Sequence, residues 1–155
     1  MVGPIVVLNG PNLNLLGQRN PEVYGRATLA DAESSARAAA ACGDRKAEFF
    51  QTNHEGEFID RIHAERGRAS GIVINAGGLS HTSIALRDAV EASTCPVVEV
   101  HVSNIHGREA YRRHSYISEV VDGVIVGLGI AGYALAVRAL LTLGDADAAE
   151  GTQAR

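Results

Sequence analysis

The chain has 155 residues with a formal net charge of −4, and 46% of its residues are hydrophobic. This length suits one domain, and the negative charge argues against a nucleic-acid partner, because phosphate binding requires a cationic surface. No apolar run approaches the length of a membrane span, no signal peptide is recognisable, and the two isolated cysteines indicate neither a disulfide framework nor a zinc site. We therefore expect a cytoplasmic protein with no membrane partner.

Short apolar runs alternate with helical patterns along the chain. In order, we expect a strand at residues 5–8, a helix at 28–42, a strand at 47–51, a helix at 55–66, a strand at 71–74, a helix at 80–92, a strand at 96–104, a strand at 124–126 and a helix at 130–143. Thr28 and Ser80 are predicted to be helix N-caps. The alternation predicts an α/β fold with a five-stranded parallel sheet. Residues 1–143 would form the single domain, and residues 144–155, which have no apolar pattern, are expected to be a disordered tail.

Polar segments follow three of the predicted strands. They cover residues 9–25, 75–83 and 101–115, whereas the loop after the second strand is shorter and plainer. In open parallel sheets, ligands bind beyond the carboxyl ends of the strands. The three segments therefore predict one shared site at that edge.

The predicted strand at residues 96–104 carries a chemically suggestive alternation. Its valines fall on one face, while the opposite face has Glu99, His101 and Ser103. A carboxylate beside an imidazole sets the tautomer and basicity of that ring. The alternatives are a half-exposed strand with a polar face and a hydrogen-bonded core histidine.

The loop at residues 9–25 contains Asn12, Arg19 and Tyr24. A free tyrosine at neutral pH is only about one part in a thousand ionised, so using the phenolate costs about 4 kcal/mol, and a nearby guanidinium recovers part of this. The alternative is a loop tyrosine that covers apolar surface. Because the chain has a single lysine, Lys46, and lacks a P-loop, a GxSxG elbow and metal-ligand spacing, acid–base chemistry is favoured.

A GxGxxG pattern at residues 127–132 raises a different function. It follows a strand and opens a helix, so a non-catalytic module that binds a nucleotide or a flavin is the alternative. The dinucleotide fingerprint, however, belongs to the first βαβ unit, with an acidic residue about 20 positions later at the end of the next strand. Here no strand follows. A tight turn with close helix–strand packing is the favoured interpretation.

Five segments together resemble the type II 3-dehydroquinate dehydratases, from about Ile5 to Leu143: NGPNLNLLGQRNPEVYG, QTNHEGEFIDRI, INAGGLSHTSIALRDAV, VEVHVSNIHGREAYRRHSYIS and GVIVGLGIAGY. The resemblance implies a flavodoxin-like three-layer sandwich with strand order 2-1-3-4-5, no metal or cofactor, and a dodecamer of trimers. It also implies anti elimination of water from 3-dehydroquinate through an enolate, giving 3-dehydroshikimate. This reaction serves the shikimate pathway to aromatic amino acids or, in some organisms, quinate breakdown.

The resemblance also implies a role for each matched residue. Tyr24, as a phenolate favoured by Arg19, takes the C2 proton, and Asn12 helps to hold a water at the enolate oxygen. His101, oriented by Glu99, protonates the departing C1 hydroxyl.

The remaining matched residues would bind substrate, and residues 19–26 would form a lid. These binding residues are Asn75, His81, Ser103, Arg112 and the backbone of Val102, with Asp88 supplied by a neighbouring subunit.

Overall fold

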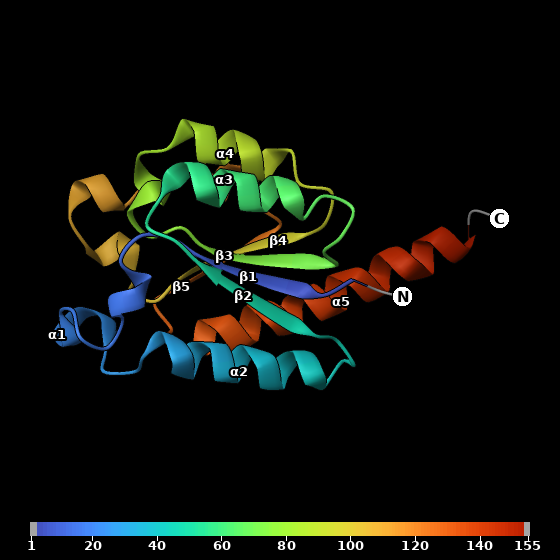
Figure 1. The fold of residues 1–155 in the computed structure, drawn as a ribbon, viewed down its shortest axis with the longest axis horizontal. Helices are drawn as coiled ribbons and strands as arrows, with labels where there is room; N and C mark the ends of the chain where they lie inside the picture. Colours follow the sequence, from blue (N-terminus) through green and yellow to red (C-terminus); the bar gives the residue numbers. More distant parts are fainter. Residues whose placement is uncertain (1–2, 154–155) are drawn as a thin grey trace.

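The computed structural model describes residues 3–153, and it describes side chains as far as Gly144. Five strands form a central sheet: β1 Ile5–Asn9, β2 Ala47–Gln51, β3 Gly71–Asn75, β4 Val97–His101 and β5 Gly123–Val126. The α-helices are α1 Pro21–Tyr24, α2 Leu29–Ala41, α3 Glu55–Ala64, α4 Ile84–Glu91 and α5 Ala131–Gln153. Figure 1 shows three layers, with α3 and α4 on one face of the sheet and α2 and α5 on the other.

The sheet is parallel throughout, as the alternation of strands and helices predicted, and has the order β2-β1-β3-β4-β5 that the family resemblance implied. Its register brings Asn9 at the end of β1 beside Asn75 at the end of β3. On β4, His101 lies two residues beyond Glu99, which pairs with Ile74 of β3. The polar ends of the three central strands therefore meet at one edge.

Both faces of the sheet are covered by helices, which explains why β1 and β3 are apolar on both sides until their last residue. Strand residues alternate between two buried clusters, one packed against α2 and α5 and the other against α3 and α4. The buried residues that helix α2 contributes to the first cluster are all alanines, namely Ala32, Ala36, Ala39 and Ala40. Helix α5 fills the remaining space with Tyr133, Ala136, Val137 and Leu140, all at most 2% exposed.

The helix starts follow local capping chemistry. The Thr28 side chain accepts from the Asp31 N–H while the Asp31 carboxylate accepts from the Thr28 N–H, so the predicted cap of α2 is confirmed as a capping box. The prediction of Ser80 as the cap of α4 is wrong. Ser80 is buried in a 3-10 turn, Gly77–His81, and Ser83 caps the helix by accepting from the Leu86 N–H at 2.9 Å. The run SHTS offers hydroxyls at three positions, and the 3-10 turn delays the helix to the last of them.

The final helix continues beyond its expected end at Leu143, as far as Gln153. The added residues include several alanines, which are strong helix formers. Side chains after Gly144 lie outside the described residues, and so do residues 154–155, so the disordered tail at 144–155 stays a prediction.

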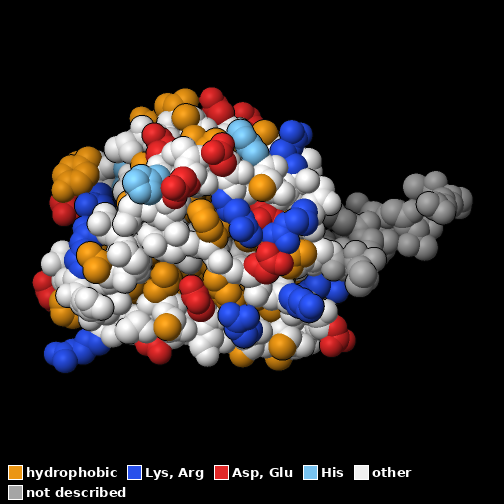
Figure 2. All heavy atoms as spheres, in the orientation of Figure 1, with side chains coloured by type: hydrophobic (Ala, Val, Ile, Leu, Met, Phe, Trp, Pro, Cys, Tyr) orange, Lys and Arg blue, Asp and Glu red, His pale blue; other side chains and the backbone are white. Residues whose placement is uncertain are grey.

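Charged side chains of both signs are interspersed on the face seen in Figure 2. That face has no continuous basic surface of the kind that nucleic acid requires. Within residues 3–153, no helix combines the length and the apolar character needed to cross a membrane.

Candidate active site

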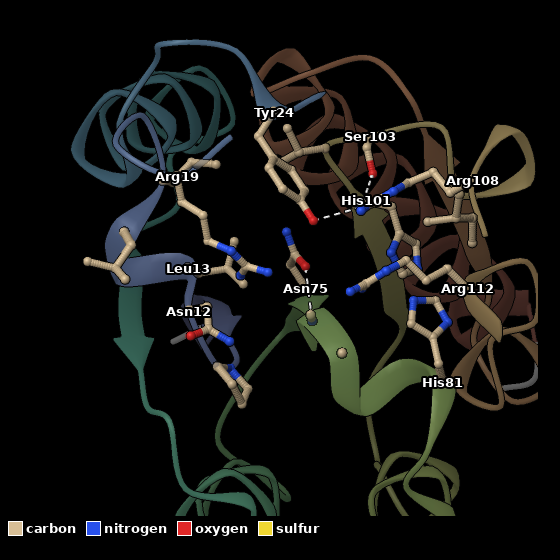
Figure 3. Close-up of a pocket in the computed structure, with 17 residues that line it drawn as sticks. Asn12, Leu13, Arg19, Tyr24, Asn75, His81, His101, Ser103, Arg108 and Arg112 are labelled. Atoms are coloured by element: carbon tan, nitrogen blue, oxygen red, sulfur yellow. Dashed lines mark hydrogen bonds between the residues drawn. The ribbon is translucent and has the colours of Figure 1, made fainter. Parts of the chain in front are cut away.

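A pocket opens at the carboxyl edge of the sheet, between the loops that follow β1, β3 and β4 (Figure 3). The structure brings most of the predicted site residues together around it: Asn12, Arg19, Tyr24, Asn75, His81, His101, Val102, Ser103 and Arg112. Glu99 lies behind the pocket wall, and Asp88 lies elsewhere. The expectation that three separate segments converge on one site is therefore met.

Glu99 and His101 form a buried pair on β4. The His101 Nε2 lies 2.7 Å from the Glu99 Oε1, and the two residues are 5% and 0% exposed. The Ser115 hydroxyl donates to the same carboxylate oxygen at 2.6 Å, and the Ser118 hydroxyl donates to the other.

Burial acts to raise the pKa of Glu99, but hydrogen bonds from His101, Ser115 and Ser118 outweigh it and hold the pKa below its ordinary range. The group is therefore a carboxylate at neutral pH. Because a carboxylate only accepts hydrogen bonds, Nε2 of His101 is the donor to Glu99. Nδ1 is then the ring nitrogen that is able to exchange a proton with a ligand.

His81 extends this arrangement toward the pocket rim. Its Nδ1 lies 2.7 Å from the carbonyl oxygen of His114, and a carbonyl only accepts, so Nδ1 carries a proton. Its ring stacks on that of His101 with centroids 5.9 Å apart. Burial lowers the pKa of His81, and the neighbouring His101 and Arg112 lower it further, so the ring is neutral at pH 7 with Nε2 as an acceptor.

Tyr24 faces the pocket from the one-turn helix α1 and is flanked by two guanidinium groups. Arg108 Nη1 donates to the Tyr24 hydroxyl at 2.7 Å and to the Ser103 hydroxyl at 3.3 Å. The guanidinium carbons of Arg108 and Arg19 lie 5.1 Å and 5.8 Å from the centre of the Tyr24 ring. The phenol oxygen therefore accepts a hydrogen bond from a positively charged group.

Arg108 is the residue that sequence reasoning missed. The segment after β4 contains several arginines, and nothing in their spacing shows which one reaches a tyrosine 84 positions earlier in the chain. Only the folded loop brings the two together.

Asn12 occupies the left-handed region with φ 68°, which asparagine tolerates better than most residues. Its N–H donates to the Asn53 Oδ1 at 2.9 Å, and the Gln51 amide donates to the same oxygen at 3.2 Å. The loop after β2, which looked plain in the sequence, therefore supports this wall of the pocket.

The rim of the pocket is cationic, with Arg19, Arg108 and Arg112 among its lining residues. Glu109, which is about half exposed, lies 3.4 Å from both Arg108 and Arg112 and offsets their charge in part. This charge favours an anionic ligand such as a carboxylate.

Asp88 does not contribute to the pocket within one chain. It lies on α4, its side chain is 64% exposed, and its carboxylate is 3.2 Å from Arg87.

The first two glycines of the GxGxxG segment have their N–H groups occupied by protein. The Gly127 N–H donates to the carbonyl oxygen of His101 at 3.1 Å, and the Gly129 N–H donates to that of Val102 at 3.0 Å. A phosphate cradle needs such N–H groups to be free. A Cβ built on Gly132 would lie 3.1 Å from Val100, so this glycine serves close packing of α5 on the sheet. These contacts favour the structural interpretation of the motif over nucleotide binding.

Within the described part of the chain, no three His, Cys, Asp or Glu side chains are grouped so that they could hold a metal ion. The cofactor-free reaction implied by the sequence resemblance remains an expectation.

The fold and the pocket define a flavodoxin-like α/β protein with an acid–base site. The family model described as Dehydroquinase class II matches residues 3–141. The 3-dehydroquinate dehydratase 2 of Agrobacterium fabrum is 56% identical over 137 residues, which cover 88% of this chain and 93% of that protein. The catabolic 3-dehydroquinase of Penicillium rubens is 54% identical over 133 residues, 86% of each chain.

The crystal structure of the type II dehydroquinase from Propionibacterium acnes superposes with a TM-score of 0.86 at 40% identity, covering 92% of this chain and 98% of that one. The chain therefore belongs to the class II dehydroquinase family, which confirms the resemblance seen in the sequence motifs.

Proposed function

We propose that this chain is a type II 3-dehydroquinate dehydratase, a hydro-lyase that converts 3-dehydroquinate to 3-dehydroshikimate and water. Family membership and the names of the relatives support the reaction. The observation that carries the assignment is that a phenol held by a guanidinium and an imidazole held by a carboxylate open into one pocket. Such a pair suits removal of a proton at one carbon and delivery of a proton to a leaving group at the next.

In the first step, the Tyr24 phenolate takes the C2 proton, which is acidic because it lies next to the ketone. The C2–H electrons move into the carbonyl and form an enolate. Arg108 donates to the phenol oxygen and Arg19 lies over the ring, so both place positive charge where the base acts, and a water held by Asn12 would stabilise the enolate oxygen.

In the second step, the enolate re-forms the ketone and pushes out the C1 hydroxyl, which His101 protonates so that it leaves as water. A double bond between C1 and C2 results. The Glu99 carboxylate stabilises the protonated ring before it gives up the proton. Tyr24 at the end of α1 and His101 at the end of β4 approach the pocket from different elements, which suits an anti elimination with the two proton transfers on opposite faces of the substrate.

The other lining residues would bind the substrate. Arg112 suits the carboxylate, since a guanidinium can pair with both of its oxygens. The neutral His81, the Ser103 hydroxyl, the Asn75 amide and the backbone N–H of Val102 suit the ring hydroxyls and the remaining carboxylate oxygen.

The experiment that tests this function is a spectrophotometric assay with 3-dehydroquinate, which follows the conjugated enone of the product. Tyr24→Phe should abolish turnover while calorimetry still detects substrate binding. Tyr116→Phe removes a hydroxyl outside the pocket and should keep the wild-type rate. Absence of turnover by the wild-type chain contradicts the function, and substantial activity in Tyr24→Phe excludes this residue as the base.

We infer that the site is completed by a neighbouring subunit in a homo-oligomer, a trimer-based dodecamer. The exposed position of Asp88, away from its own pocket, supports a role in a neighbour's pocket. Mixing Asp88→Asn with Tyr24→Phe after joint refolding should restore part of the turnover, because some sites then combine the intact Tyr24 of one chain with the intact Asp88 of its neighbour. No recovery in mixed oligomers contradicts the shared site.

A role in the shikimate pathway follows from the proposed reaction, and the cytoplasmic location stays a prediction.

A further inference from the structure

A chain of buried polar side chains lies directly behind the pocket. The hydroxyl of Tyr133 on α5 contacts Asn9 at the end of β1 and Asn75 at the end of β3. Tyr133 and Asn9 are fully buried and Asn75 is 4% exposed, yet Asn75 also lines the pocket. One helix on the far side of the sheet therefore touches a pocket residue through a single hydroxyl group.

The hydrogen bonds of this chain fix the orientation of the Asn75 amide. Tyr133 has one hydroxyl proton, which it donates to the Asn9 Oδ1 at 2.7 Å, so toward Asn75 its oxygen only accepts. The Asn75 Nδ2 donates to it at 2.8 Å, and the Gly77 N–H donates to the Asn75 Oδ1 at 3.2 Å. Rotating the amide by 180° would place donor against donor at Gly77. Burial raises the pKa of Tyr133, so the hydroxyl keeps its proton at neutral pH.

This orientation leaves the second hydrogen on Nδ2 of Asn75 available to a ligand. Figure 3 shows the Asn75 amide at the centre of the labelled side chains, between Arg19 and His101. A donor at that position suits a substrate hydroxyl or its leaving oxygen.

The GxGxxG segment explains how the Tyr133 hydroxyl on α5 comes within hydrogen-bond distance of Asn9 and Asn75 at the strand ends. Gly127 and Gly129 have φ of 83° and 60°, a conformation that favours glycine, and their N–H groups hold the turn against the end of β4. Gly132 has no side chain to keep α5 away from Val100. The next residue is Tyr133, so the close approach of the helix delivers its hydroxyl to the ends of the strands.

We propose that Tyr133 is a positioning residue that fixes the amide of Asn75 toward the substrate, and that the GxGxxG segment serves this placement. The inference rests on the proposed dehydratase function. In this enzyme the GxGxxG segment would therefore position a side chain, whereas in dinucleotide-binding folds the same motif binds phosphate.

A double-mutant cycle with Tyr133→Phe, Asn75→Ala and the double variant tests the proposal, measured as kcat/KM for 3-dehydroquinate. Phenylalanine keeps the ring packing and removes only the hydroxyl. We expect kcat/KM to fall about tenfold in Tyr133→Phe, the scale of one lost buried hydrogen bond, and less than twofold further when Asn75 is already alanine. Tyr116→Phe is the matched control and should stay within twofold of the wild type.

An equal loss from Tyr133→Phe in both backgrounds overturns the proposal, because a merely structural hydroxyl acts independently of Asn75. If Asn75→Ala does not fold, Asn75→Ser takes its place in the cycle. The same variants are unfolded in urea, a measurement that needs no activity. Additive changes in unfolding free energy also overturn the proposal, whereas absence of wild-type turnover refutes the dehydratase function alone.

Discussion

Arg108→Gln should impair the enzyme more than the corresponding change at Arg19. Arg108 donates to the Tyr24 hydroxyl at 2.7 Å, within the range of charge-assisted hydrogen bonds, and such bonds contribute about 1.5–3 kcal/mol. At 1.36 kcal/mol per tenfold change, kcat should fall about 10- to 150-fold. The nearby Glu109 offsets part of the charge, which favours the lower half of this range.

Arg19 lies 5.8 Å from the centre of the Tyr24 ring. A contact of this kind at an exposed site contributes about 0.5–1 kcal/mol, so Arg19→Gln should reduce kcat only about two- to fivefold.

The assay is enone formation at saturating 3-dehydroquinate across a pH series. Arg66→Gln is the matched control, because it removes the same charge from an exposed position outside the pocket. A larger loss of kcat in Arg19→Gln than in Arg108→Gln refutes the assignment of Arg108 as the main partner of Tyr24.

Three further predictions concern stability, measured by urea unfolding. Burial acts to raise the pKa of Glu99, but its hydrogen bonds outweigh burial and hold the folded pKa below the ordinary value of a glutamate. This carboxylate therefore stabilises the fold above that ordinary value, and the contribution is lost as pH falls through the folded pKa. Glu99→Gln should therefore flatten the loss of stability in acid, and an unchanged acid profile contradicts this. Phe58→Ala empties a fully buried position and should cost about 3–5 kcal/mol; a cost under about 1 kcal/mol contradicts its place in the core. Thr28→Ala removes the capping box of α2 and should cost about 1 kcal/mol, whereas no change means that the cap is dispensable.

The sequence predicted the sheet well because its signals are local. Strands β1 and β3 are short apolar runs closed by polar residues, and the helices α3 and α4 each have an apolar stripe. The alternation on β4 also predicted correctly that Glu99 and His101 share a face. Element ends were less predictable, as Ser80 shows, because several neighbouring hydroxyls can cap the same helix.

The contacts between distant segments were beyond sequence reasoning. Arg108 reaches Tyr24 only because two loops fold over the same edge of the sheet, and Tyr133 reaches Asn75 across 58 positions of the chain. The asparagine pair Asn12 and Asn53 is a third example. Each depends on strand order and register, which no local pattern encodes.

The last helix has a consequence for how the protein is made. Every residue assigned to the reaction precedes residue 113, yet α5 supplies Tyr133 and half of the apolar layer beneath the sheet. A nascent chain that has emerged only as far as β5 thus contains all the residues assigned to the reaction, but the sheet face that α5 covers is still exposed. Activity should therefore appear during synthesis only after this carboxyl-terminal segment leaves the ribosome. A chain truncated before residue 131 would expose the apolar side chains of the strands and should aggregate.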